Sequence, residues 1–212
     1  MPKDLQDTQE QQESDWRNKM KIYKLGEEVL RKKAVPVSAE EINDSLRETF
    51  NEMFETMLEA DGVGLAAPQI GDSRRYFVII SDDEVRRVFI NPQIISTSQN
   101  LCEYEEGCLS LPGFSEKIMR PEKITVQALN EFGKAFTLNA EGLLARIIQH
   151  EYDHLEGMVY IDRGDPQYAA KVTEQMKKRL ERAAKKEAEK ARKSARIAAK
   201  IAAKEAKKNS YR

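Results

Sequence analysis

Apolar residues recur at helical spacing in a stretch that begins about 40 residues into the chain. The apolar positions lie three or four residues apart, at Ile42, Leu46, Phe50, Phe54 and Met57. This spacing is typical of an amphipathic helix with one buried face. Ser38, with Glu41 three residues later, is a candidate cap at its start, and we expect this helix to end at Asp61-Gly62.

Between residues 75 and 139 the pattern changes to short runs rich in β-branched and aromatic residues. Asn-Pro, Pro-Gly and single glycines separate the runs, as is typical of strands joined by turns. We expect strands over residues 76–80, 88–90, 94–96, 101–105, 124–128 and 135–138. Together they predict antiparallel or mixed sheets.

A second helix is predicted where apolar residues cover most of the helical circumference. Its markers are Leu143, Leu144, Ile147, Ile148 and Leu155. A helix that is apolar nearly all round is expected to be buried, so we place it across the middle of the domain. The predicted fold class is therefore α+β, with antiparallel or mixed sheets packed around a central helix.

After Asp165-Pro166 the chain consists mainly of Ala, Lys, Glu and Arg, with no glycine or proline. This composition strongly favours a long C-terminal helix. If residues 167–208 are all helical, they span about 60 Å at about 1.5 Å per residue, which is more than the side of a small domain. We therefore expect part of this helix to project into solvent.

Length and charge divide the chain into three parts. A chain of 212 residues suits one domain with a hydrophobic core plus appendages. We expect a polar, disordered extension over residues 1–19 or a true start at Met20, then a domain over 20–165 and a basic helix over 166–212. Residues 171–212 hold 16 Lys and Arg against 5 Asp and Glu, a charge of +11, which leaves −12 for residues 1–170. The two parts are expected to meet different partners.

Targeting signals and disulfides are not indicated. No apolar run approaches the roughly 18 residues that cross a bilayer. The first 19 residues contain five acidic residues and little apolar content, unlike a secretory signal or a mitochondrial presequence. With only Cys102 and Cys108, reduced thiols are expected. These features predict a cytoplasmic protein with no membrane or DNA partner.

The strongest chemical signal lies in the predicted buried helix, where His150, Glu151 and His154 form an H-E-x-x-H pattern. Positions i and i+4 share one helical face, so both imidazoles can bind one metal ion. Glu151 lies beside them and can pass a proton from water to a leaving amine. The alternative is two histidines that merely pack. They are the only histidines in the chain, and two would fall four apart by chance only about once in a hundred trials.

A catalytic site of this kind needs a third protein ligand. The metzincin continuation H-x-x-G-x-x-H is disfavoured, because Tyr160 stands where its last histidine should be. The third ligand is therefore a carboxylate or a cysteine. Cys108, in the run Glu-Gly-Cys-Leu-Ser after a predicted strand, is a good soft ligand, although a buried structural thiol is also common. For Cys102, which has no such context, we expect the structural role.

A third segment, with the sequence Gly-Val-Gly-Leu-Ala-Ala-Pro-Gln, runs from Gly62 to Gln69 directly after the first predicted helix. Taken alone, its glycines suggest only a helix end and a tight turn. Small residues also let the backbone approach a ligand closely. The Gln69 amide is a candidate donor to a developing oxyanion.

Taken together, the three segments closely resemble the peptide deformylase motifs G-x-G-x-A-A-x-Q, E-G-C-x-S and Q-x-H-E-x-D-H-x-x-G. The matches run in order over residues 62–69, 106–110 and 149–157, and the resemblance covers roughly residues 20–165. It implies a hydrolase that removes the formyl group from N-formyl-methionyl nascent polypeptides.

The resemblance also implies roles for individual residues. Cys108, His150 and His154 would bind one divalent ion per chain, Fe²⁺ by resemblance, although Zn²⁺, Ni²⁺ or Co²⁺ also suit the ligands. Glu151 would be the general acid and base, while Gln69 and the Leu109 backbone N–H would form the oxyanion site. The residues expected to contact substrate are Gly64, Val63, Leu143 and Ile147, the last two as walls for methionine or simply as helix core.

Two other functions compete with this one. An H-E-x-x-H metallopeptidase would cleave internal peptide bonds and use a different third ligand. A non-catalytic ribosome- or RNA-binding protein is suggested by the +11 tail, but a closed structural metal site would need neither Glu151 nor Gln69. By resemblance the basic C-terminal helix docks a deformylase on the ribosome, and a merely solvated helix is the alternative.

Overall fold

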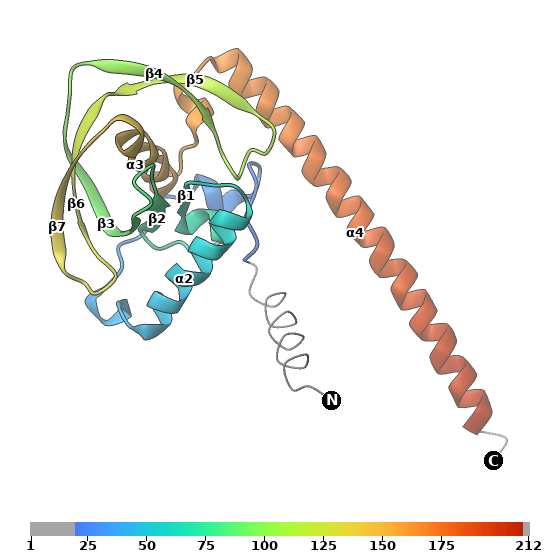
Figure 1. Cartoon of the computed structure of the whole chain (residues 1–212). Coiled ribbons are helices and arrows are strands. Elements are labelled where there is room, and N and C mark those ends of the chain that lie inside the picture. Colours follow the sequence, from blue (N-terminus) through green and yellow to red (C-terminus); the bar gives the residue numbers. More distant parts are fainter. Residues whose placement is uncertain (1–19, 210–212) are drawn as a thin grey trace, which may run out of the picture.

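The computed structural model describes residues 20–209, with side chains placed as far as residue 200. The extension predicted to be disordered over residues 1–19 lies outside the described residues. The observed architecture confirms the predicted α+β class, with two antiparallel sheets around a central helix and a long C-terminal helix (Figure 1).

The larger sheet has five antiparallel strands in the order β1-β2-β3-β6-β7. Its strands are β1 (Gly64–Ala66), β2 (Tyr76–Ile80), β3 (Arg86–Thr97), β6 (Lys123–Leu129) and β7 (Ala135–Glu141). The smaller sheet is a hairpin of β4 (Leu101–Gly107) and β5 (Ser115–Pro121). The sequence pattern missed β1 and β5, because β1 has only three residues and β5 buries a single apolar side chain, Ile118, beside the charged Arg120.

The strands predicted separately over 88–90 and 94–96 are one strand, β3, and the prediction of two was wrong. The intervening Asn91-Pro92 produces a bulge, because the pairing with β6 shifts register between Ile90 and Gln93. Asn91 has φ of 51°, a left-handed conformation that asparagine tolerates, and its side chain bonds the backbone of Val37 in both directions at 2.8 Å. Proline is accepted there because a bulge needs no ladder N–H.

The first predicted helix, α2 (Asp44–Glu59), forms, but Ser38 does not cap it. Asn43 is the cap, and its side-chain oxygen accepts the Leu46 N–H at 3.1 Å. Ser38 instead caps the separate short 3₁₀ helix η2 (Ala39–Glu41), because its capping box with Glu41 closes within one turn. The remaining 3₁₀ helices are η1 (Glu28–Arg31), η3 (Ala67–Ile70) and η4 (Tyr160–Arg163).

The second predicted helix, α3 (Gly142–Leu155), lies at the centre of the domain (Figure 1). Its apolar side chains, among them Ile148 and Leu155, pack into a core with Phe77 and Val126 of the larger sheet. The same helix also buries charged and polar side chains, namely Arg146, Gln149, Glu151, Asp153 and His154. Buried charge on a core helix needs specific partners, and these polar residues mark where the chemistry of the protein lies.

The C-terminal helix α4 (Pro166–Asn209) packs against the body through its first turns. Val172 and Met176 are buried in a cluster with Leu25 and Leu111, whereas residues 181–200 are exposed. Figure 1 shows α4 continuing away from the body in one straight run. Among residues 20–209, no helix combines the length and apolar character needed to cross a membrane.

Candidate active site

A sulfur atom and two imidazoles meet between β4 and α3. Cys108 directly follows β4, while His150 and His154 lie on α3. One candidate ligand atom from each of the three residues lies within 4.8 Å of the others, and Cys108 Sγ is 3.3 Å from His154 Nε2. Atoms bound to one ion at about 2.0 to 2.3 Å lie no more than about 4.5 Å apart, so these three residues fit one metal ion with little adjustment.

The helical spacing of α3 places its site residues on the face that meets this cluster. Leu143, Ile147, His150 and His154 follow one another at intervals of three or four residues, so they form one stripe along the helix. Cys108 is held by a turn in which its carbonyl accepts the Leu111 N–H at 2.9 Å. The H-E-x-x-H prediction for the two histidines thus agrees with the geometry, and among the described residues the thiol is the third potential ligand beside them.

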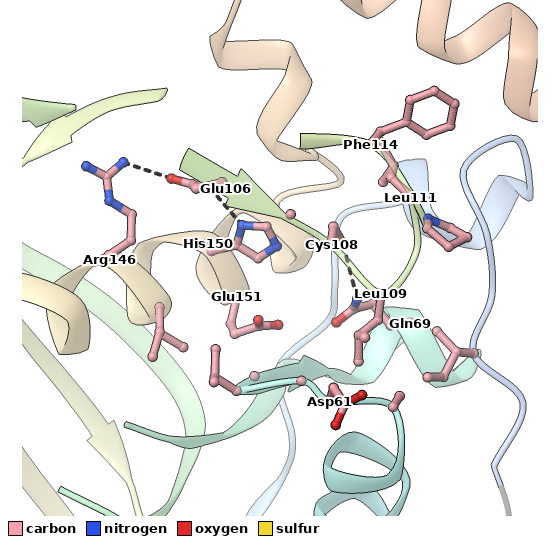
Figure 2. A pocket seen from close by; sticks show the side chains of 18 of the residues that line it. Asp61, Gln69, Glu106, Cys108, Leu109, Leu111, Phe114, Arg146, His150 and Glu151 are labelled. Atoms are coloured by element: carbon pink, nitrogen blue, oxygen red, sulfur yellow. Dashed lines mark hydrogen bonds and ion pairs between the residues drawn. The ribbon is translucent and has the colours of Figure 1, made fainter. Parts of the chain in front are cut away.

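A buried carboxylate orients the ring of His150. Glu106 Oε2 is 2.8 Å from His150 Nδ1, so the other ring nitrogen, Nε2, is the one free to face Cys108 (Figure 2). Metal-binding histidines commonly use their second nitrogen in this way, which fixes the ring orientation and tautomer. Burial raises the pKa of Glu106, but hydrogen bonds from Arg120 and His150 outweigh it and hold that pKa well below its usual range.

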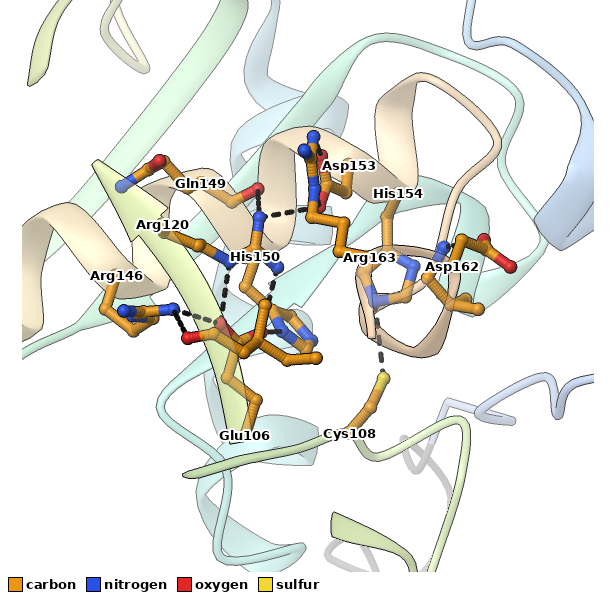
Figure 3. A network of polar contacts seen from close by, with 12 residues as sticks. Glu106, Cys108, Arg120, Arg146, Gln149, His150, Asp153, His154, Asp162 and Arg163 are labelled. Carbon is orange, nitrogen blue, oxygen red and sulfur yellow. Dashed lines mark hydrogen bonds and ion pairs between the residues drawn. The ribbon is translucent and has the colours of Figure 1, made fainter. Parts of the chain in front are cut away.

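Glu106 belongs to a buried network of charges (Figure 3). It accepts hydrogen bonds from Arg120 at 2.6 and 2.8 Å and from Arg146 at 2.8 Å. Arg120, only 2% exposed, also bonds Asp153 at 2.7 Å, and Asp153 accepts from Arg163 at 2.6 Å. Glu106 lies on β4, Arg120 on β5 and Asp153 on α3. Because these residues are paired through Arg120, the network ties both strands to the helix that carries the two histidines.

The sequence pattern does not predict this network. Glu106 and Asp153 do carry a signal, since each lies within two residues of a candidate metal ligand. Arg120 carries none, because its partners are 14 and 33 residues away in the sequence. Cys102 belongs to the network rather than to the metal cluster, and its Sγ and carbonyl accept from Arg146 Nη2 at 3.2 and 2.7 Å.

Glu151 lies on α3 with its side chain against β1. It is 3% exposed, and one carboxylate oxygen, Oε2, has no hydrogen-bond partner among the residues that the structure describes. A Cβ atom at Gly64 would lie 2.2 Å from Glu151 Oε1, so only glycine leaves room for the carboxylate. Burial raises the pKa of Glu151 to about 7, where a carboxyl group can both take up and release a proton.

Two further donors lie near the cluster. Ala66 donates its backbone N–H to Gln69 Oε1 at 2.8 Å, which leaves the Gln69 amide nitrogen facing Cys108 Sγ at 3.6 Å and Ser110 Oγ at 3.2 Å. The Leu109 N–H has no partner among the hydrogen bonds of the described residues. Gln69 and the Leu109 N–H therefore lie beside the sulfur, where the oxyanion site is expected.

One cavity of about 590 Å³ is lined by Gln69, Cys108, Leu109, His150 and Glu151 (Figure 2). The predicted substrate contacts Val63, Gly64, Leu143 and Ile147 also line it. Because β1 is an edge strand of the larger sheet, its outer edge is available to pair with an extended peptide. The structure thus brings every predicted site residue to the same cavity except His154, which is fully buried behind it.

Comparison with known proteins identifies related sequences and structures. Residues 19–170 match the family model described as polypeptide deformylase. A peptide deformylase of Fusobacterium nucleatum is 46% identical over 165 residues, which cover 76% of this chain and 95% of that protein. A peptide deformylase of Clostridium botulinum is 52% identical over 143 residues, covering 67% of this chain and 94% of that protein.

A solved structure agrees with these matches. The crystal structure of a peptide deformylase from Legionella pneumophila superposes with a TM-score of 0.70 at 44% identity. It covers 78% of this chain and 97% of its own. The similarity therefore extends over nearly the whole of that protein.

Proposed function

The chain belongs to the polypeptide deformylase family, and on that premise we propose which of its residues perform the family's reaction. The activity is hydrolytic removal of the N-formyl group from newly synthesised proteins, and it depends on a metal ion. The competing peptidase and non-catalytic functions find no support among the relatives. We propose that Cys108, His150 and His154 hold the ion.

The observation that carries this proposal is the convergence of three ligand atoms within 4.8 Å. When bound, a divalent ion polarises a carbonyl and lowers the pKa of a water molecule toward about 7. The donor set of one thiolate and two imidazoles suits Fe²⁺, Zn²⁺, Ni²⁺ or Co²⁺. We propose Fe²⁺ in the cell, on the family resemblance.

In this proposal the remaining side chains position the substrate and move protons. Glu151 takes a proton from the attacking water and gives it to the leaving amine, which its burial and free oxygen suit. Gln69 and the Leu109 N–H hold the oxygen on which negative charge develops. The edge of β1 at Val63 and Gly64 pairs with the peptide backbone, and Leu143 with Ile147 receives the methionine side chain.

The direct test is formate release from the peptide formyl-Met-Ala-Ser by the full-length protein loaded with Fe²⁺ or Ni²⁺. We expect release of formate with the Met-Ala and Ala-Ser bonds intact, measured by formate assay and by mass spectrometry of the peptide. Acetyl-Met-Ala-Ser is the matched control substrate and should remain intact. Cleavage at internal peptide bonds, without formate, would identify a peptidase instead.

We also propose that α4 docks the protein on the ribosome, which places it in the cytoplasm where nascent chains emerge. The +11 charge of residues 171–212 and the exposure of residues 181–200 support this partner. Deleting residues 182–212 spares the packed residues Val172 and Met176, so the body should remain folded. We expect the full chain, and not the truncated one, to co-sediment with ribosomes, more weakly as salt rises. Equal co-sedimentation of both proteins contradicts the proposal.

A further inference from the structure

The segment formed by residues 23–25 lies against both segments that carry the proposed oxyanion donors. The Tyr23 N–H donates to the Gln69 carbonyl at 2.7 Å, and the Leu25 N–H donates to the Ser110 carbonyl at 3.0 Å. Between them, Lys24 Nζ donates to the Leu109 carbonyl at 2.7 Å. Three successive residues thus bond to the two segments that carry the proposed oxyanion donors, one at Gln69 and the other at Leu109 and Ser110.

The contact made by Lys24 is unusual for a lysine. Its side chain lines the cavity, and among the described residues no carboxylate pairs with its ammonium group. Burial lowers its pKa and outweighs the attraction of Cys108 and Glu27, which raises it. A half-buried cation whose direct partner is a neutral carbonyl gains less than one paired with an acid, so its position is not explained by stability alone.

This contact fixes the backbone around Leu109. The peptide unit between Leu109 and Ser110 is held at both ends, because Lys24 binds its carbonyl and Cys108 Sγ accepts its N–H at 3.4 Å. The preceding peptide unit is held through the Cys108 carbonyl, which accepts the Leu111 N–H at 2.9 Å. Within the described part of the chain the Leu109 N–H has no partner, so this donor of the turn is left for substrate.

We propose that Lys24 is a positioning residue for the oxyanion site. Its ammonium group holds the Leu109 carbonyl, so that the N–H of Leu109 stays directed at the substrate oxygen. The inference rests on the role proposed for Leu109 in deformylation. Preorganised donors act mainly on the transition state. Loss of the contact between Lys24 and the Leu109 carbonyl therefore lowers kcat and leaves substrate binding nearly unchanged.

The test compares Lys24→Met with Lys21→Met in formate release from formyl-Met-Ala-Ser. Complete loss of an oxyanion donor costs about 10² to 10³ in rate, and we expect the loosened donor in Lys24→Met to cost about tenfold in kcat with KM changed less than about twofold. Lys24→Arg keeps a charged donor and should recover most of kcat. Lys21 lies three residues before Lys24 but pairs with Glu27 at 2.7 Å on the surface, so Lys21→Met should match wild type.

Metal content and the unfolding midpoint are measured on each variant. A kcat of Lys24→Met equal to that of the wild type overturns the inference. A fall in kcat that is accompanied by lower metal content or lower stability overturns it as well. A rise in KM without a fall in kcat overturns it too, because it assigns Lys24 to substrate binding. Absence of formate release from the wild type would refute the proposed function instead, so the two failures are distinguishable.

Discussion

Replacing Cys108 by alanine is expected to remove both the metal ion and the activity. A catalytic site of this type uses three protein ligands, and the variant retains only His150 and His154. Even changes to residues around the ligands typically cost about 10- to 100-fold in metal affinity, so loss of a direct ligand should exceed about 100-fold. Metal content after dialysis, measured by elemental analysis, and formate release report the two losses separately.

Cys102→Ala is the matched control for this experiment. Cys102 is the other thiol of the chain, and its sulfur contacts Arg146 rather than the histidines. This variant should retain its metal and nearly all its activity. Retention of metal by Cys108→Ala would mean that the third ligand lies elsewhere, as expected of an H-E-x-x-H peptidase.

Replacing Glu151 by glutamine is expected to lower kcat by about 10² to 10⁴ and to leave the metal in place. Glutamine has the shape of glutamate, so the close contact with Gly64 can be retained. Its amide cannot take up and release the proton that hydrolysis requires. The measurements are kcat for formyl-Met-Ala-Ser and metal content, because a fall in kcat at full metal content isolates the proton transfer.

Glu156→Gln provides a matched control at the end of the same helix. Glu156 pairs with Arg75 at 2.7 Å and with Lys33 at 2.8 Å, and it does not line the cavity. We expect kcat of this variant to stay within about twofold of wild type, since it changes no group near the site. If Glu151→Gln behaves like Glu156→Gln, another group must move the proton.

The sequence by itself determined the parts of this protein that follow local rules. The 3.6-residue period of α3 places His150 and His154 on one face whatever surrounds them, and the composition after Pro166 favours the helix α4 in any context. Three ordered motifs were specific enough to indicate the family, which the comparisons confirm.

Only the tertiary structure decided how the site is held together. Helical spacing predicts neighbours three or four residues apart, whereas Lys24 meets Leu109 across 85 positions and Arg120 meets Asp153 across 33. Such pairs form because tertiary packing brings segments together that are distant in the sequence, and no local sequence pattern predicts which segments meet. The residues proposed as metal ligands were therefore readable in the sequence, while the groups that orient them became visible only in the folded chain.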